Sequence, residues 1–323
     1  YKKDLTIFWQ LQKKYWRKFL TLNGIVLTEH TTISSLHTII GVICMVRNCF
    51  LGTDKDNQDL RNQFLKADNS RTGKGLIANN IIRVVEKFVP DDEVVVSKKL
   101  TEAGLIGGLE GRGDNKQEVI GLCERLLVYK DEFQEDIEKK DPKDDVMGTI
   151  RICCNNYGRK DNIIKNSARS QQDYPAYHGK ATFLCTLTPN KLKIKKHELI
   201  ENGTLQRFDL DFDEIELNRS MDIFEAMKKS RLSQEERQEL LVKQRETLEK
   251  ITNILGEIKK DTIVYINDDY YTECINNIKE KVKREFEVDI ERGRILHGLW
   301  ISNLNIMMKC AARVALVRGK RSV

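Results

Sequence analysis

The stretch ADNSRTGKGLIANNIIRVV, residues 67–85, decides the fold. An apolar run (NQFLKA) leads into it and the helical pattern GLIANNIIRVVEKF completes it, so we expect a strand, a loop and a helix. The loop contains T-G-K-G, the mark of a phosphate-binding loop, usually G-x-x-x-x-G-K-[ST]. This loop departs at two positions: Asp68 replaces the first glycine, and Gly75 replaces the hydroxyl residue that binds Mg²⁺.

The two departures leave the main physics of such a loop intact. Phosphates are held by backbone N–H groups and by the positive end of the helix dipole, neither of which needs a particular side chain. Lys74 supplies the positive charge, Asp68 is tolerated if its side chain points away, and a water can occupy the position of the missing hydroxyl. We therefore interpret the stretch as a variant ATP site. Its predicted phosphate-binding residues are Asn69, Ser70, Arg71, Thr72, Gly73, Lys74 and Gly75.

A second motif, RLLVYKDEF, fits a strand that ends in two carboxylates. In phosphoryl-transfer sites the first carboxylate, here Asp131, holds Mg²⁺, and the second, here Glu132, orients the attacking water. The two motifs occur in the right order, each at the end of a predicted strand. Together they predict ATP and Mg²⁺ as cofactors.

Two further signals follow along the chain. TLTPN ends another predicted strand and would place Thr188 and Asn190 near a γ-phosphate; the alternative is a plain turn at Pro189. In NGTLQRFDLDF, an arginine lies between apolar residues and acids. Arg207 is either part of a folding salt bridge or a finger that reaches a neighbouring subunit's nucleotide.

Strands that alternate with helices predict an α/β core with a parallel sheet. We expect an N-terminal helical segment over 1–32 that packs on the rest, a core over 33–220 with a buried helix at 33–50, and an all-helical C-terminal part over 221–323. LGTDKDNQD is predicted to be a polar loop, and the glycine-rich stretch after LTEAG a helix with a hairpin or loop. Leu241, Leu248 and Leu255 are expected in the core of the helical part.

Taken together, these motifs resemble the AAA+ ATPase module of the minichromosome-maintenance replicative helicases and the related plasmid and viral primase-helicases. Asp131-Glu132-Phe133 resembles that family's D-E-F, and Gln206-Arg207-Phe208-Asp209-Leu210 its S-R-F-D-L, whose arginine is the finger acting in trans. Thr188-Pro189 falls at the first sensor, GLIGGL at the helix-2 insertion, and MKCAARVAL at the lid helix with the second sensor, for which Lys309 is the nearest match.

The resemblance covers roughly residues 33–217, with a weaker match over 300–316. It implies a P-loop AAA+ core with a helical lid, a homo-oligomer that is most often a ring of six, and primase or initiator domains as further partners. Asp68, Gly75, Lys130 and Thr188 depart from the family pattern, which bears on the rate of hydrolysis more than on the fold. The first residue is Tyr1 and no zinc-bearing DNA-binding domain is visible, so we expect the motor part of a longer protein.

A basic stretch points to DNA independently of the resemblance. Residues 151–196 contain ten Lys or Arg and two acids, a local charge of +8 in a chain of net charge +6, with tyrosines interleaved. Phosphate neutralisation and base stacking are what single-strand channels use. The predicted DNA contacts are Arg159, Lys160, Lys165 and Arg169; the alternative is a solvated basic loop.

The composition of the 323 residues, 40% hydrophobic and 32% charged, is that of a soluble globular protein. The eight cysteines form no C-x-x-C pair and the five histidines show no ligand spacing, so we expect reduced thiols and no zinc site. No apolar run is long enough to span a bilayer. We expect a cytoplasmic protein, or one at a nuclear or viral replication site.

These observations predict a subunit of an ATP-driven DNA translocase or helicase motor that serves DNA replication. Its catalytic residues are expected to be Glu132, Arg207, Thr188 and Lys309. The alternative is a nucleotide-gated DNA-binding scaffold or initiator that hydrolyses ATP weakly, which Asp68 and Gly75 favour. A motor acting on protein is a third class, and the basic stretch argues against it.

Overall fold

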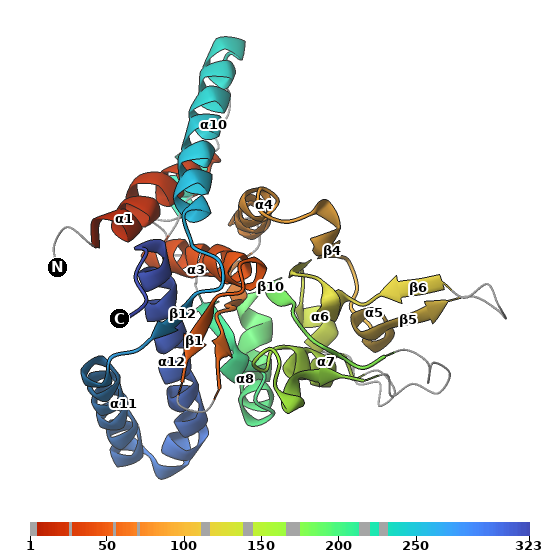
Figure 1. The fold of residues 1–323 in the computed structure, drawn as a ribbon, viewed down its shortest axis with the longest axis vertical. Coiled ribbons are helices and arrows are strands. Elements are labelled where there is room, and N and C mark those ends of the chain that lie inside the picture. The colour runs from red at the N-terminus through yellow and green to blue at the C-terminus, as the bar shows by residue number, and fades with distance from the viewer. Residues whose placement is uncertain are drawn as a thin grey trace.

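The computed structural model is built around a sheet of five parallel strands in the order β11-β3-β10-β7-β4 (Figure 1). It describes residues 5–25, 28–53, 56–69, 72–110, 117–137, 145–165, 175–212, 220–225 and 232–323. The strands are β3 Gln63–Ala67, β4 Val94–Ser97, β7 Leu127–Lys130, β10 Thr182–Leu187 and β11 Phe208–Phe212. The prediction of an α/β fold with a parallel sheet is confirmed, and four strands lie where the sequence places them. The fifth, β11, was not predicted.

The three central strands are buried on both faces, as their apolar sequences require. Successive side chains point to opposite faces, so Phe64 belongs to one core cluster and Leu65 to the other. Helices α3 (Glu29–Val46) and α4 (Lys74–Val85) pack on the first face. The second face is covered by α5 Glu102–Ile106, α6 Gln134–Ile137, α7 Val146–Cys153 and α8 Pro189–Glu201.

A small second sheet, β12-β1-β2, corrects two predictions. Its strands are β1 Phe50–Gly52, β2 Gln58–Asp59 and β12 Ile263–Tyr265. β1 pairs in parallel with β12, so the C-terminal part is not all helical, and the segment expected to be a polar loop supplies two strand ends. Leu51 and Val264 are buried in this pairing, which explains why such short strands form.

Helices from both ends of the chain pack together. The N-terminal segment consists of α1 Leu5–Trp9, the π-helical η1 Gln10–Trp16 and α2 Arg17–Leu22. Trp16 is fully buried and its Nε1–H donates to Ser35 Oγ on α3 at 2.9 Å, so the segment packs on the core as expected. The C-terminal helices are α10 Gln234–Gly256, α11 Asp268–Val288 and α12 Ile290–Val317.

Helix α10 contacts the N-terminal helices with one end and projects away from the sheet with the other (Figure 1). Leu255 is fully buried and Leu248 packs against the core, but Leu241 is 62% exposed. The prediction that all three leucines lie in the core is therefore wrong for Leu241, because the helix extends past the surface it packs on. Within the described residues, no helix is long and apolar enough to cross a membrane.

Two antiparallel strand pairs are attached to the core. β5 Gly107–Glu110 and β6 Gln117–Ile120 form the hairpin expected in the glycine-rich stretch. β8 Ile163–Ile164 pairs with β9 Tyr177–His178 within the basic stretch. The Tyr177 hydroxyl donates to the Ile106 carbonyl at 2.8 Å, so the two pairs lie next to each other. Short 3₁₀ turns complete the chain at Asp91–Glu93, Leu122–Glu124, Lys160–Asn162 and Leu205–Arg207.

Candidate functional site

The carboxyl ends of β3, β10 and β7 lie side by side, because β10 pairs with both of the others. Ligands in open α/β sheets bind outside this edge. A cavity of about 460 Å³ lies here, within the size range of small-molecule sites. Its lining residues are Gly73, Lys74, Gly75, Leu76, Asn79, Asp131, Glu132, Gln134, Leu187 and Thr188. Lys74, the two carboxylates and Thr188 thus share one cavity.

Lys74 is the first residue of α4, so its ammonium group lies at the N-terminus of that helix. Gly73 before it has φ 91°, a left-handed conformation that disfavours any residue with a Cβ. The Lys74 Nζ donates to the carbonyls of Asp68 at 2.7 Å and Leu187 at 3.1 Å. Partial burial lowers the pKa of Lys74, although the nearby carboxylates of Asp68, Asp131 and Glu132 oppose that shift.

The carboxylates sit on a fixed turn after β7. Asp131 Oδ1 accepts hydrogen bonds from the Glu132 N–H and from the Thr186 hydroxyl. Glu132 has φ 51°, which is uncommon for a residue other than glycine, asparagine or aspartate. Phe133 is fully buried, and its N–H donates to the Thr186 carbonyl at 2.8 Å. Backbone strain of this kind persists where the surroundings enforce it, and it clusters at functional sites.

Asp68 does not face the cavity. Its side chain is fully buried, its Oδ1 accepts from the Asn69 N–H, and its Oδ2 lies 3.7 Å from Lys66 Nζ. Lys66 also pairs with Asp211 at 2.8 Å. The carboxylate at the position of the usual first glycine is thus turned away from any phosphate and balanced by a buried lysine.

Two polar residues near the cavity escaped the sequence analysis. Thr186 precedes the predicted Thr188 by two residues and reaches Asp131, while Thr188 is the residue just before α8 and lines the cavity. Tyr129 precedes Asp131 by two residues and lies beneath Gly75. Burial raises the pKa of Tyr129 to about 12, so its hydroxyl stays protonated. Strand alternation could have indicated both, because residues i and i+2 share a face.

Some predicted residues do not line this cavity. Asn69 and Thr72 lie in the loop, where the Thr72 hydroxyl donates to the Asn69 carbonyl at 2.8 Å. Asn190 is exposed on α8, outside the lining. Ser70 and Arg71 lie outside the described residues. Lys130, a departure from the family pattern, points to the other face of the sheet and pairs with Asp136 at 3.5 Å.

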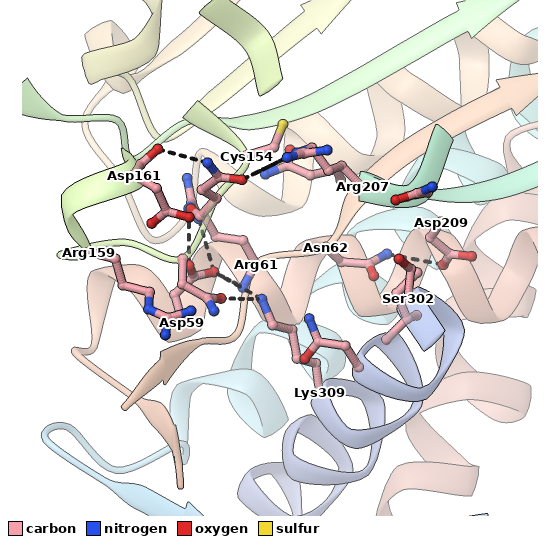
Figure 2. Close-up of a pocket in the computed structure, with 16 residues that line it drawn as sticks. Asp59, Arg61, Asn62, Cys154, Arg159, Asp161, Arg207, Asp209, Ser302 and Lys309 are labelled. Carbon is pink, nitrogen blue, oxygen red and sulfur yellow. Dashed lines mark hydrogen bonds and ion pairs between the residues drawn. The ribbon is translucent and has the colours of Figure 1, made fainter. Parts of the chain in front are cut away.

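Arg207 and Lys309 line a second cavity of about 270 Å³, formed by β2, the segment after α7, the turn at Leu205–Arg207 and helix α12 (Figure 2). Arg207 donates from Nε and Nη2 to Asn155 Oδ1 at 3.2 and 3.1 Å, and from Nη1 to the Gly203 carbonyl. Burial lowers its pKa. None of these bonds goes to a carboxylate in the described part of the chain, which disfavours the folding salt bridge. Lys309 lies 3.7 Å from Asp59 and donates to Asn156 Oδ1 at 3.1 Å.

A buried pair, Asp59 and Arg61, joins this cavity to the basic stretch. Arg61 donates to both Asp59 oxygens and to the carbonyls of Cys153, Asn155, Gly179 and Ala181. Burial alone would raise the pKa of Asp59, but the positive charges of Arg61 and Lys309 hold it well below the usual range. The sequence did not reveal this pair.

The basic stretch presents charge to solvent. Arg159, Lys160 and Lys165 are exposed, and Arg159 Nη2 lies 3.1 Å from Asp56 at the surface. Tyr157 packs edge-on against His178, so one aromatic side chain is placed beside these cations. Arg169 lies outside the described residues.

The described residues hold neither a disulfide nor a cluster of metal ligands. All eight cysteines are free thiols. Over the described ranges, no three His, Cys, Asp or Glu side chains gather into a group that could hold a metal ion. A magnesium ion that arrives with a nucleotide needs only one or two carboxylates, because phosphates and waters complete its shell. The exposed carboxylate of Asp131 beside Lys74 fits that need.

No protein-family model matches the chain, and no curated protein matches it. The likeness of the motifs to the helicase family therefore stays a prediction.

Proposed function

We propose that the protein is an ATP-driven motor subunit that translocates along or unwinds DNA in replication, organised as an AAA+ ATPase. The observation that carries the proposal is the gathering of Lys74, Asp131, Glu132 and Thr188 around one cavity at the carboxyl edge of the parallel sheet. These groups come from three strand ends that are far apart in sequence.

The proposed roles follow from charge and position. Lys74 and the amides at the start of α4 hold the phosphates, because a helix N-terminus favours anions. Asp131 holds Mg²⁺, which would neutralise phosphate charge when bound. Glu132 orients the attacking water, and its left-handed backbone turns it out of the strand direction beside Asp131. Thr188, at the end of β10, lies on the same cavity as a polar sensor of the terminal phosphate.

The DNA part of the proposal rests on Arg159, Lys160 and Lys165, which are exposed at the base of the β8–β9 pair. Single-strand channels combine such cations with aromatic side chains. Arg207 and Lys309 would act on a nucleotide held by a second copy of the chain, in an oligomer for which the family resemblance suggests a ring of six.

One observation favours a weakly hydrolysing scaffold instead. Residue 75 is glycine, and the hydroxyl that usually binds Mg²⁺ is missing from the loop. The other departure, Asp68, gives less support, because its carboxylate faces Lys66. A retained Glu132 in a strained conformation has little use in a protein that only binds nucleotide.

The test is a steady-state ATPase assay with and without single-stranded DNA. The motor predicts turnover that DNA stimulates. Glu132→Gln should bind a fluorescent ATP analogue normally and slow turnover by about 10²–10⁴-fold, the usual worth of a general base. Lys74→Ala should lose both turnover and binding of the analogue. Nucleotide binding without turnover in the wild type would select the scaffold, and normal turnover in Glu132→Gln would remove Glu132 from the proposed role.

A further inference from the structure

A hydroxyl from elsewhere in the chain lies next to the position of the missing loop hydroxyl. A Cβ built on Gly75 would meet one atom within 4 Å outside its own helix and neighbouring residues, the Tyr129 Oη, at 3.8 Å. In the usual loop the residue at this position is Ser or Thr, and its hydroxyl lies on Mg²⁺. Gly75 itself lines the cavity, as does Asp131, two residues after Tyr129.

The Tyr129 side chain is built into the core, and its hydroxyl makes no hydrogen bond of normal geometry with the described residues. The residue is 4% exposed and belongs to the core cluster that α4 packs against. Within the described residues its Oη has no hydrogen bond of normal geometry, although Thr186 and Asp131 lie close enough to affect it. A buried polar atom without a partner costs free energy. Phenylalanine would fill the same core space without that cost, so packing alone does not account for the hydroxyl.

We propose that the Tyr129 hydroxyl, delivered from β7, replaces the loop hydroxyl that Gly75 lacks and helps to hold the magnesium ion of a bound nucleotide. The inference rests on the proposed function, because it needs a nucleotide in the cavity.

The positions of Tyr129 and Gly75 both allow the hydroxyl to come from either residue. Tyr129 and Asp131 are consecutive same-face positions of β7 and its end. Asp131 lines the cavity, and the buried Tyr129 hydroxyl lies beside Gly75, which also lines it. The space above Gly75 admits a serine, because its Cβ would make an ordinary van der Waals contact with the Tyr129 Oη. The hydroxyl can therefore be removed at one residue and restored at the other.

The experiment measures the affinity of a fluorescent ADP in saturating Mg²⁺ and in EDTA, and takes the ratio of the two dissociation constants. The variants are Tyr129→Phe, Gly75→Ser and the double variant, with Tyr270→Phe as a matched control. Tyr270 is a partly buried tyrosine on α11, away from this cavity. Tyr129→Phe should reduce the Mg²⁺-dependent gain about fivefold, the worth of one net hydrogen bond, and leave the affinity in EDTA unchanged. The double variant should regain most of the Mg²⁺-dependent gain in affinity. Tyr270→Phe should show the same gain as the wild type.

Three outcomes would overturn the inference. If Tyr129→Phe keeps the full Mg²⁺-dependent gain, the hydroxyl plays no part in holding the ion. If the gain falls but Gly75→Ser does not restore it, Tyr129 does not stand in for the loop residue. If affinity falls equally in Mg²⁺ and EDTA, the residue is structural. A wild type that binds no nucleotide under either condition instead refutes the proposed function, so the two failures are distinguishable.

Discussion

At the scale of single residues, the buried charges behind the loop explain how it tolerates an aspartate. Lys66 lies near the carboxyl end of β3 with almost no exposure, between Asp68 and Asp211. Asp211 also accepts a hydrogen bond from the Thr31 hydroxyl at 2.6 Å and lies 3.1 Å from His30. A buried ion that loses its partner costs roughly 3–5 kcal/mol, so each of these charges depends on the others.

This cluster predicts a loss of stability in acid. Burial alone would raise the pKa of Asp211, but His30, Lys66 and Thr31 lower it from 3.8 to about 2. A lowered carboxyl pKa contributes stability that is fully present above the unfolded value and is lost as pH falls toward the folded one. The contribution is about 2.5 kcal/mol, at roughly 1.4 kcal/mol per pKa unit.

Urea unfolding of the wild type and Asp211→Asn measures this contribution. The difference between their free energies of unfolding should be largest near neutral pH and shrink by about 2.5 kcal/mol as pH falls from about 6 to about 1. Asp209→Asn, in the same strand, is the control; Asp209 accepts a hydrogen bond from the neutral Asn62 amide. A difference between wild type and Asp211→Asn that does not change with pH would contradict the assignment.

At the scale of elements, the basic stretch is held at its base, while the side chains of Arg159, Lys160 and Lys165 are exposed. Arg61 and the fully buried Asn162 bind backbone carbonyls on both sides of it; Asn162 Nδ2 donates to Cys153 and Gly179 at 3.0 Å. Because the exposed cations take little part in this scaffold, they can be removed without loss of the fold. Surface pairs such as Arg159–Asp56 are worth about 0–1 kcal/mol.

Alanine at Arg159, Lys160 and Lys165 should therefore weaken DNA binding equally across sequences. The slope of log K against log salt should flatten by about 0.7–0.9 for each phosphate that is no longer neutralised. The measurement is a fluorescence-anisotropy titration of single-stranded DNA at several salt concentrations. Alanine at Lys250, Lys279 and Lys283 removes the same charge from exposed positions on α10 and α11, and should leave the slope unchanged. If the slope is the same in both triple variants, the basic stretch is a solvated loop that does not contact DNA.

The sequence predicted the long or strongly apolar elements and missed the short ones. β3, β7, β10 and α3 are buried runs whose apolar patterns determine them. β11 alternates polar and apolar residues, the pattern of a half-buried strand, so local pattern could have indicated it. β12 is three residues long and pairs with a strand about 210 residues earlier, so local pattern cannot reveal it. The Lys74 cavity was predictable from strand ends; the contact between Arg207 and Asn155 depends on tertiary folding alone.

At the scale of the whole molecule, the two cavities are separate. The one that contains Lys74 and Glu132 shares no lining residue with the one that contains Arg207 and Lys309. Arg207 is instead occupied by Asn155 and Gly203 within its own chain. An arginine that stabilises a terminal phosphate must approach it directly. If Arg207 serves catalysis, a second copy of the chain has to bring its own Lys74 cavity to it.

Mixing two inactive variants tests this arrangement. Arg207→Ala should bind nucleotide and assemble, yet lose roughly 10³–10⁵ in turnover, the range for arginine fingers in other phosphoryl-transfer systems. Lys74→Ala should assemble and keep Arg207 intact, but it should bind no nucleotide. In mixed assemblies, an interface that joins the Lys74 cavity of the first variant to the Arg207 of the second contains both groups, so activity should return when the variants are combined.

Asn155→Ala is a useful companion, because it releases Arg207 without removing its charge and should keep the ability to complement Lys74→Ala. If the mixture co-assembles and remains inactive, or if the active species is a monomer, Arg207 serves only to hold Asn155 and the segment beside it.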